Sequence, residues 1–204
     1  MPDKRRAPGE DVLSDLVAAD PEGLHADATA GLAAMLLFAG HETTVTRIDV
    51  GTVLLLAHPE QYRALAADPT RVPATVEEIL RLAAPGGSGG LPRYAHADIP
   101  VGHVTIRAGD AVVLSPAAAN RDPAAFPDPE VFDPDRAAGG HLAFGHGPRY
   151  CIGAALARVE LQAVFTALPA RFPTIELALP VEDLEVRADL LTGGLRALPV
   201  RWRS

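Results

Sequence analysis

The sequence predicts a mainly α-helical protein with small β-sheets, an α+β fold in which helices build most of the core. A helical apolar pattern continues from Asp27 to about Ala57, and a second apolar helix begins at Ile152. Between them, residues 93–115 change to the period of two that is typical of strands. Hydrophobic residues make up 48% of the chain, which is enough for a sizeable core. With no internal repeat and no linker, we expect one domain over residues 1–204.

Two helices are predicted in the first part of the chain. The first covers residues 9–20 and ends at Pro21. Its apolar residues recur at helical spacing: Val12, Leu13, Leu16 and Val17. The long helix over residues 27–57 is apolar on nearly every side, which implies burial between other layers. A polar stretch, residues 39–44, interrupts that helix and therefore calls for a functional reason.

Prolines and glycines mark the next boundaries. His58-Pro59 ends the long helix, and a short helix follows around residues 61–66. Pro73 opens another helix, which Pro85 and a run of glycines break. We expect a loop from Pro85 to Leu91.

Short strands and an ordered coil are predicted for the second half. The strand pattern includes Val104, Ile106 and residues 111–114, with Gly109-Asp110 as a turn. Residues 120–136 contain four prolines among acidic residues, so this stretch is expected to be ordered coil. A glycine-punctuated loop from Phe144 to Gly153 leads into a helix from Ile152 to about Leu168, and weak strands close the chain.

Charge and composition exclude several classes of function. A net charge of -8 speaks against a nucleic-acid partner, which needs a cationic face. A single cysteine excludes an internal disulfide and a cysteine-rich zinc cluster, and favours the reducing cytoplasm. The N-terminus has no apolar signal core, and the apolar run 30–40 is shorter than the ~18 residues of a membrane span. We expect a soluble cytoplasmic protein.

The lone cysteine, Cys151, is the strongest chemical signal. It stands between a glycine-rich loop and the start of a helix, whose N-terminal dipole and free amides stabilise a thiolate. The glycines let the backbone bring its N–H groups close to the sulfur. One alternative is that the cysteine only fills apolar space. A dinucleotide-binding loop is another, but Tyr150 stands where that motif needs its third glycine.

The run from Phe144 to Gly153 matches Phe-x-x-Gly-x-x-x-Cys-x-Gly in every fixed position and so resembles the haem-binding signature of cytochromes P450. The resemblance implies haem b (iron protoporphyrin IX), with Cys151 as the axial ligand of the iron. It implies that Phe144 shields the sulfur and that Arg149 binds a haem propionate. The glycines of the cofactor-binding loop are Gly145, Gly147 and Gly153. Arg93 matches the family's other propionate-binding arginine, and its alternative is an exposed charge at a strand start.

The polar stretch of the long helix resembles the family's oxygen-activation motif. Its small residues, Ala39 and Gly40, would let haem and dioxygen approach the helix. The resemblance implies that Thr43, in a locally widened turn, donates to bound peroxide and that Glu42 relays protons. The alternative is that Thr43 only bonds back to a helix carbonyl, as threonines within helices often do.

A third match is a charged triad. Glu78 and Arg81 lie three residues apart, on one face of the predicted helix, where an exposed pair contributes only a few tenths of a kcal/mol. The resemblance implies that Arg136 completes a structural triad with them, the alternative being a surface pair. Substrate contacts come only from family positions: Leu36, Leu91, Leu191 and Thr192.

The resemblance extends from the first helix to Arg201-Trp202 but covers only the C-terminal, haem-binding half of the P450 fold. We expect the N-terminal half to be absent and exposed apolar faces to be covered by an oligomer or by that complementary half. The favoured hypothesis is a haem-thiolate monooxygenase module that oxidises a small organic substrate with electrons from a donor such as ferredoxin. The alternative is a P450-like auxiliary or truncated protein that binds other proteins, with haem absent or catalytically idle.

Overall fold

The computed structural model describes residues 2–20, 22–23, 25–83, 92–136, 140–187 and 193–202. The chain forms two compact units, Met1–Thr43 and Thr44–Ser204. The boundary falls within the long helix, which contributes its first part to one unit and the remainder to the other.

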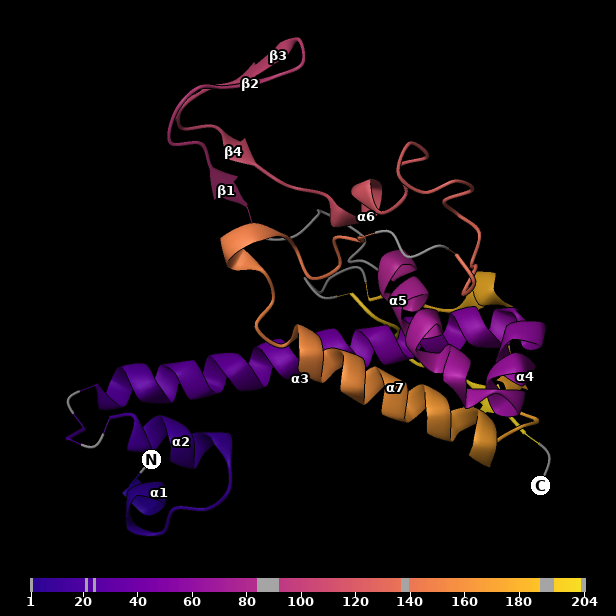
Figure 1. Cartoon of the computed structure of the whole chain (residues 1–204), viewed down its shortest axis with the longest axis horizontal. Helices are drawn as coiled ribbons and strands as arrows, with labels where there is room; N and C mark the ends of the chain where they lie inside the picture. Colours follow the sequence, from indigo (N-terminus) through magenta and orange to yellow (C-terminus); the bar gives the residue numbers. More distant parts are fainter. Residues whose placement is uncertain are drawn as a thin grey trace. The chain divides into compact units, whose positions relative to one another are not determined.

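Helices dominate both units, with small sheets in the second, which confirms the predicted α+β class. The helices are α1 (Pro2–Arg6), α2 (Val12–Ala18), α3 (Ala26–Ala57), α4 (Pro59–Ala67), α5 (Val72–Leu82), α6 (Pro116–Ala119) and α7 (Ala154–Arg171) (Figure 1). Single 3₁₀ turns occur at Pro69–Arg71, Gly147–Arg149 and Val181–Asp183. The strands form antiparallel pairs: β1 (Arg93–Tyr94) with β4 (Ala111–Val112), β2 (Ile99–Val101) with β3 (Val104–Ile106), and β5 (Glu176–Leu177) with β6 (Val200–Arg201).

The first unit holds a helix that the sequence pattern does not predict. Helix α1 is five residues long and carries mostly charged side chains, so it has no apolar periodicity to reveal it. It packs on α2, and Lys4 pairs with Asp11. The Asp11 carboxylate also accepts a hydrogen bond from the Ser14 backbone N–H, at 2.9 Å, and so caps α2. That cap explains why α2 begins at Val12, three residues later than predicted.

The long helix α3 has the predicted length, but its two parts differ in burial. Near its C-terminal end Leu55 is fully buried. In the first part Leu37 is 74% exposed and Phe38 is 60% exposed. The burial predicted for the whole helix is therefore seen mainly in its second part, although Thr29 in the first part is also buried.

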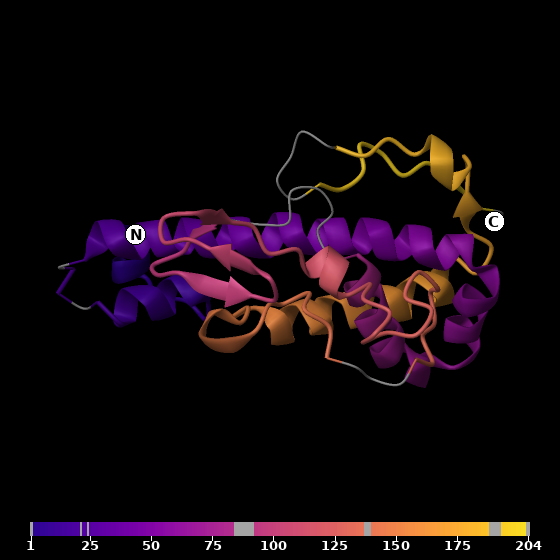
Figure 2. The same cartoon turned by 90° about the horizontal axis from the view of Figure 1, so that it is seen from above.

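The core of the second unit forms where α4 and α5 pack against α7 and the second part of α3, an arrangement visible from two directions in Figures 1 and 2. Helix α5 is buried on most sides: its apolar residues enter the core, and the charged Glu78 and Arg81 are buried as well. The buried core residues are Leu55, Leu56, Tyr62, Leu65, Val72, Val76, Ile79, Leu80, Leu82, Ala83, Phe132, Leu161 and Phe165.

Gly51 marks the closest approach of α3 to this core. A Cβ atom added at Gly51 would lie 2.5 Å from Cζ of Phe165 and 2.8 Å from Cγ2 of Ile79. These contacts are too short, so only glycine fits between the two side chains without a shift of the core.

Gly51→Ala is accordingly expected to destabilise the fold by about 1–3 kcal/mol, because overpacking outweighs the better helix propensity of alanine. The measurement is the free energy of unfolding in urea. Gly31→Ala is the matched control, since nothing lies within 4 Å of a Cβ there and alanine should stabilise the helix by up to about 1 kcal/mol. If both variants were equally stable, the close packing at Gly51 would be wrong.

Several predicted boundaries need correction. Helix α7 begins at Ala154, not at Ile152, and continues past Leu168 to Arg171 with Pro169 inside it. Helix α4 begins at Pro59, earlier than residue 61, because proline fits the first turn of a helix. Helix α6 was not predicted; the Ser115 hydroxyl oxygen accepts from the Ala118 N–H and caps this single turn.

Residues 120–136 contain no helix or strand, as predicted. Within the described ranges, no helix is both long and apolar enough to cross a membrane.

Candidate functional site

The loop that carries Cys151 folds back on itself before α7 begins. The backbone N–H of Cys151 donates to the carbonyl of Phe144 at 2.9 Å, and the N–H of Tyr150 donates to the carbonyl of Gly147 at 3.0 Å. Gly145 and Gly147 have φ angles of 75° and 73°, a region that other residues rarely adopt. The loop therefore needs glycine at both positions, and it places Cys151 directly ahead of α7.

The thiol of Cys151 is free and exposed. Its neighbour Ile152 is 90% exposed, and Tyr150 is exposed as well. Within this chain the Cys151 side chain therefore does not fill apolar space.

Cys151, Arg149 and Arg93 have the chemistry that a haem group needs. A cysteine sulfur is a soft ligand of the kind that binds a haem iron. Arg149 and Arg93 are both exposed, and neither pairs with a carboxylate within the described part of the chain. Their guanidinium groups are thus free to bind carboxylates such as haem propionates. Gly153 leaves the sulfur uncovered. Even a Cβ atom at this position would lie 3.9 Å from the Cys151 sulfur, an ordinary van der Waals contact.

The polar stretch of α3 lies at the end of the first unit: residues 39–43 belong to that unit, and Thr44 begins the second. Helix α3 is a regular α-helix throughout, so the widened turn expected at Thr43 is absent. The Thr43 hydroxyl donates to the carbonyl of Ala39 at 2.6 Å, which is the back-bonded alternative raised from the sequence. Glu42 is half-buried, with its Oε1 3.6 Å from Nδ1 of His41. A Cβ at Gly40 would meet nothing within 4 Å, so Gly40 leaves open space beside the helix.

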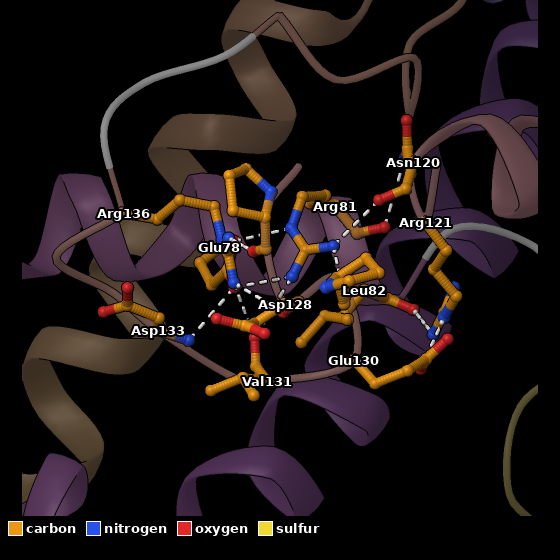
Figure 3. A network of polar contacts seen from close by, with 12 residues as sticks. Glu78, Arg81, Leu82, Asn120, Arg121, Asp128, Glu130, Val131, Asp133 and Arg136 are labelled. Atoms are coloured by element: carbon orange, nitrogen blue, oxygen red, sulfur yellow. Dashed lines mark hydrogen bonds and ion pairs between the residues drawn. The ribbon is translucent and has the colours of Figure 1, made fainter. Parts of the chain in front are cut away.

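The predicted charged triad is an ion-pair network in the structure. Arg81 Nε and Nη2 donate to the two carboxylate oxygens of Glu78, both at 2.8 Å, and Arg136 Nε donates to Glu78 Oε1 at 3.3 Å (Figure 3). The side chains of Arg81 and Glu78 are only 2% and 5% exposed, so the pair is not a surface contact. The backbone N–H of Asp133 also donates to Glu78, at 3.0 Å.

The two arginines also hold the coil of residues 120–136. Arg81 donates to the backbone carbonyls of Asn120, Pro129 and Val131 at 2.8, 2.7 and 3.2 Å. Arg136 donates to the carbonyls of Pro127, Asp128 and Val131 (Figure 3). A coil without a strand ladder thereby has its carbonyl groups satisfied by side chains.

Asn120 has a structural role that the sequence does not indicate. It is fully buried, its amide Nδ2 donates to the Arg81 carbonyl at 3.1 Å, and its Oδ1 accepts from the Leu142 N–H at 2.7 Å. It thus links α5 to the segment that precedes the cysteine loop. No local pattern could reveal a bond between residues so far apart in the chain.

Glu77, beside the triad, was also missed. Its carboxylate accepts from Arg158 Nε at 2.7 Å and Nη2 at 2.9 Å, and it lies 3.1 Å from Nε2 of His141. Burial alone would raise the pKa of Glu77, but the hydrogen bonds from His141 and Arg158 outweigh it and lower the pKa from 4.5 to about 2. Because the pKa is lower in the folded state, this pairing stabilises the fold above about pH 4.5 and loses its effect as the pH falls toward 2.

Three of the expected substrate contacts, Leu91, Leu191 and Thr192, lie outside the described residues. The fourth, Leu36, is half-buried on α3.

Comparisons with known proteins agree on one family. The family model described as "Cytochrome P450" matches residues 3–178. The chain is 50% identical over 203 residues to pentalenolactone synthase of Streptomyces exfoliatus. The matched region covers 98% of this chain and 51% of that protein. It is 42% identical over 201 residues to the 6-deoxyerythronolide B hydroxylase of Saccharopolyspora erythraea, covering 97% of this chain and 49% of that protein.

The fold is similar to that of solved P450 structures. The crystal structure of cytochrome P450 MoxA from Nonomuraea recticatena superposes with a TM-score of 0.91 at 44% identity, over 98% of this chain and 50% of that one. The chain thus spans about half the length of the relatives it matches.

Proposed function

The chain belongs to the cytochrome P450 family, and on that premise we propose that it forms the haem-thiolate module of a monooxygenase that oxidises a small organic substrate with dioxygen. The observation that carries this proposal is the exposed thiol of Cys151, held ahead of α7 by a loop that two glycines permit. The hydroxylases and oxygenases among the relatives support the same class of reaction.

Each predicted site residue has a distinct task in this proposal. Haem b bound through a cysteine thiolate supplies an iron that activates dioxygen, because the ligand pushes electron density toward the O–O bond. Cys151 provides that ligand, and the N-terminus of α7 stabilises its negative charge. Arg93 and Arg149 pair with the propionates, and the ring of Phe144 covers the approach to the sulfur.

Glu42 and Thr43 handle protons. The Thr43 hydroxyl gives its hydrogen to the Ala39 carbonyl, so this hydrogen bond must break before the hydroxyl can donate to a bound molecule. The carboxyl group of Glu42 is the neighbouring proton source. Gly40 and Ala39, both small, keep that side of α3 open.

The electrons would come from a separate donor such as a ferredoxin, and the complete activity would need the rest of the family fold. The exposed apolar side chains of α3 and α7 support a covering partner: Leu32, Met35, Leu37 and Phe38 on α3, and Leu156 and Val159 on α7. Monomeric proteins seldom expose apolar patches beyond a few hundred Å². The proposed cover is a complementary N-terminal half or, failing that, a second copy of the chain.

The isolated chain is therefore expected to self-associate and to bind a hydrophobic dye. Light scattering at low protein concentration measures the association, and dye fluorescence measures the exposed apolar surface. Adding a separately expressed N-terminal half of a relative should reduce both signals. A monodisperse monomer that binds no dye would contradict the proposed cover.

The haem assignment is tested by the absorption spectrum of the reduced, carbon-monoxide-treated protein after haem addition. A Soret band at the position typical of thiolate ligation is the expected result. A haem complex without thiolate ligation, or no complex at all, would refute the proposed function and favour a role in protein binding.

A further inference from the structure

Around the cysteine loop lies a set of contacts that the haem assignment does not use. Arg158, on the first turns of α7, is the centre of the set. Its guanidinium donates twice to Glu77 on α5 and once, through Nη1, to the hydroxyl of Tyr150 at 3.3 Å. The same guanidinium lies over the ring of Phe144, 4.6 Å from the ring centroid. One side chain therefore contacts two residues of the loop and one residue of α5.

The contacts meet the loop at the residues that fix the cysteine. Tyr150 directly precedes Cys151, and the carbonyl of Phe144 accepts the hydrogen bond from the Cys151 N–H. The rings of Phe144 and Tyr150 also contact each other edge to face, with centroids 6.2 Å apart. Any shift of the Arg158 guanidinium would therefore act on two residues that hold Cys151, Phe144 and Tyr150.

Glu77 determines where that guanidinium lies. A bidentate carboxylate fixes both the position and the plane of a guanidinium group. Glu77 is itself held from a third segment, because its Oε2 lies 3.1 Å from His141 Nε2, while His141 Nδ1 accepts from the Ala143 N–H at 3.2 Å. With Nδ1 acting as acceptor, the Nε2–H of His141 is the donor to Glu77. The His141 side chain is only 7% exposed, so the donor of this bond is shielded from water, while the Glu77 carboxylate is 40% exposed.

We propose that Glu77 is a positioning residue for the thiolate: through Arg158 it orders the loop from Leu142 to Gly153 and thereby sets the orientation of Cys151. The proposal rests on the proposed function only where haem is concerned. The ordering of the loop is a property of the polypeptide and can be measured without haem.

The first test is hydrogen–deuterium exchange of the haem-free full chain. Glu77→Gln keeps the shape of the side chain but removes the charge that holds Arg158, so amides of residues 142–153 should exchange about tenfold faster. Arg158→Lys keeps the positive charge but cannot hold Glu77 and Tyr150 together, and should have a similar effect. Tyr150→Phe removes only the hydroxyl and should accelerate exchange by about two- to threefold.

Two controls separate local loosening from general unfolding. Glu160→Gln changes an exposed carboxylate of α7 that pairs with no residue in the described part of the chain, and it should leave exchange unchanged. In every variant the amides around Leu161 and Phe165, in the buried part of α7, should keep the wild-type rate. Unchanged exchange in the loop, or an equal acceleration in the core and the loop, would overturn the proposal.

The second test uses the haem-loaded protein. Glu77→Gln should lower the fraction of the reduced carbon monoxide complex that shows the thiolate Soret band several-fold, and Glu160→Gln should not. Full thiolate ligation in Glu77→Gln would contradict the positioning role. If the wild-type chain itself shows no thiolate complex, the proposed function fails, and loop exchange alone then decides whether Glu77 orders the loop.

Discussion

Replacement of Cys151 by alanine is expected to abolish the thiolate spectrum and with it the retention of haem. The chain has no second cysteine, so no other thiolate can replace it as a ligand. A ligand that binds only the folded state stabilises it by about 2.7 kcal/mol at 100 times its Kd. Haem at that concentration should therefore raise the unfolding free energy of the wild-type chain by about this amount and leave that of Cys151→Ala unchanged.

The matched control for this variant is His146→Ala. His146 lies in the same loop, is exposed, and occupies a variable position of the signature. This variant should bind haem as the wild-type chain does. Retention of the thiolate Soret band in Cys151→Ala would show that the cysteine is not the ligand.

Glu78→Ala is expected to destabilise the protein by about 3–5 kcal/mol, which approaches the whole stability of many domains. The substitution leaves the guanidinium of Arg81 buried, since only 2% of that side chain is exposed. It also removes the acceptor for Arg136 and for the Asp133 N–H, so the coil of residues 120–136 loses its attachment to α5. The free energy of unfolding in urea measures the loss.

An exposed glutamate provides the comparison. Glu60, on α4, pairs with no residue in the described ranges, and Glu60→Ala should change the unfolding free energy by less than about 0.5 kcal/mol. If Glu78→Ala were as mild as Glu60→Ala, the network would contribute no more than a surface ion pair.

The sequence predicted those elements whose formation depends on neighbouring residues, such as long helices and proline-rich coil. The apolar pattern of α3 gave its bounds to within one residue, since a long periodic segment is the clearest helical signal. The pairing of Glu78 with Arg81 followed from their spacing, and the proline content of residues 120–136 predicted coil. In contrast, α1 and α6 are too short for any period to appear.

Contacts between distant segments could not be read in the same way. Asn120 has no sequence neighbour that explains its burial, and the partner of Glu77 lies on α7. Nothing in the sequence around His141 indicates its bond to Glu77, which is 64 residues away in the chain. At Thr43 the resemblance predicted a widened turn, but the hydroxyl completes its hydrogen bond with the preceding turn, so the helix stays regular.

The adjacent carboxylates of α5 have a consequence for which sequence changes the chain can accept. Consecutive residues of an α-helix point about 100° apart, and so Glu78 reaches the proline-rich coil while Glu77 reaches α7 and the cysteine loop. An insertion or deletion of one residue ahead of this pair would turn Glu77 away from Arg158 on α7, and would turn Glu78, together with its partner Arg81, away from the proline-rich coil. The length of the segment from Val72 to Glu77 is therefore under stricter constraint than the identity of its solvent-facing residues.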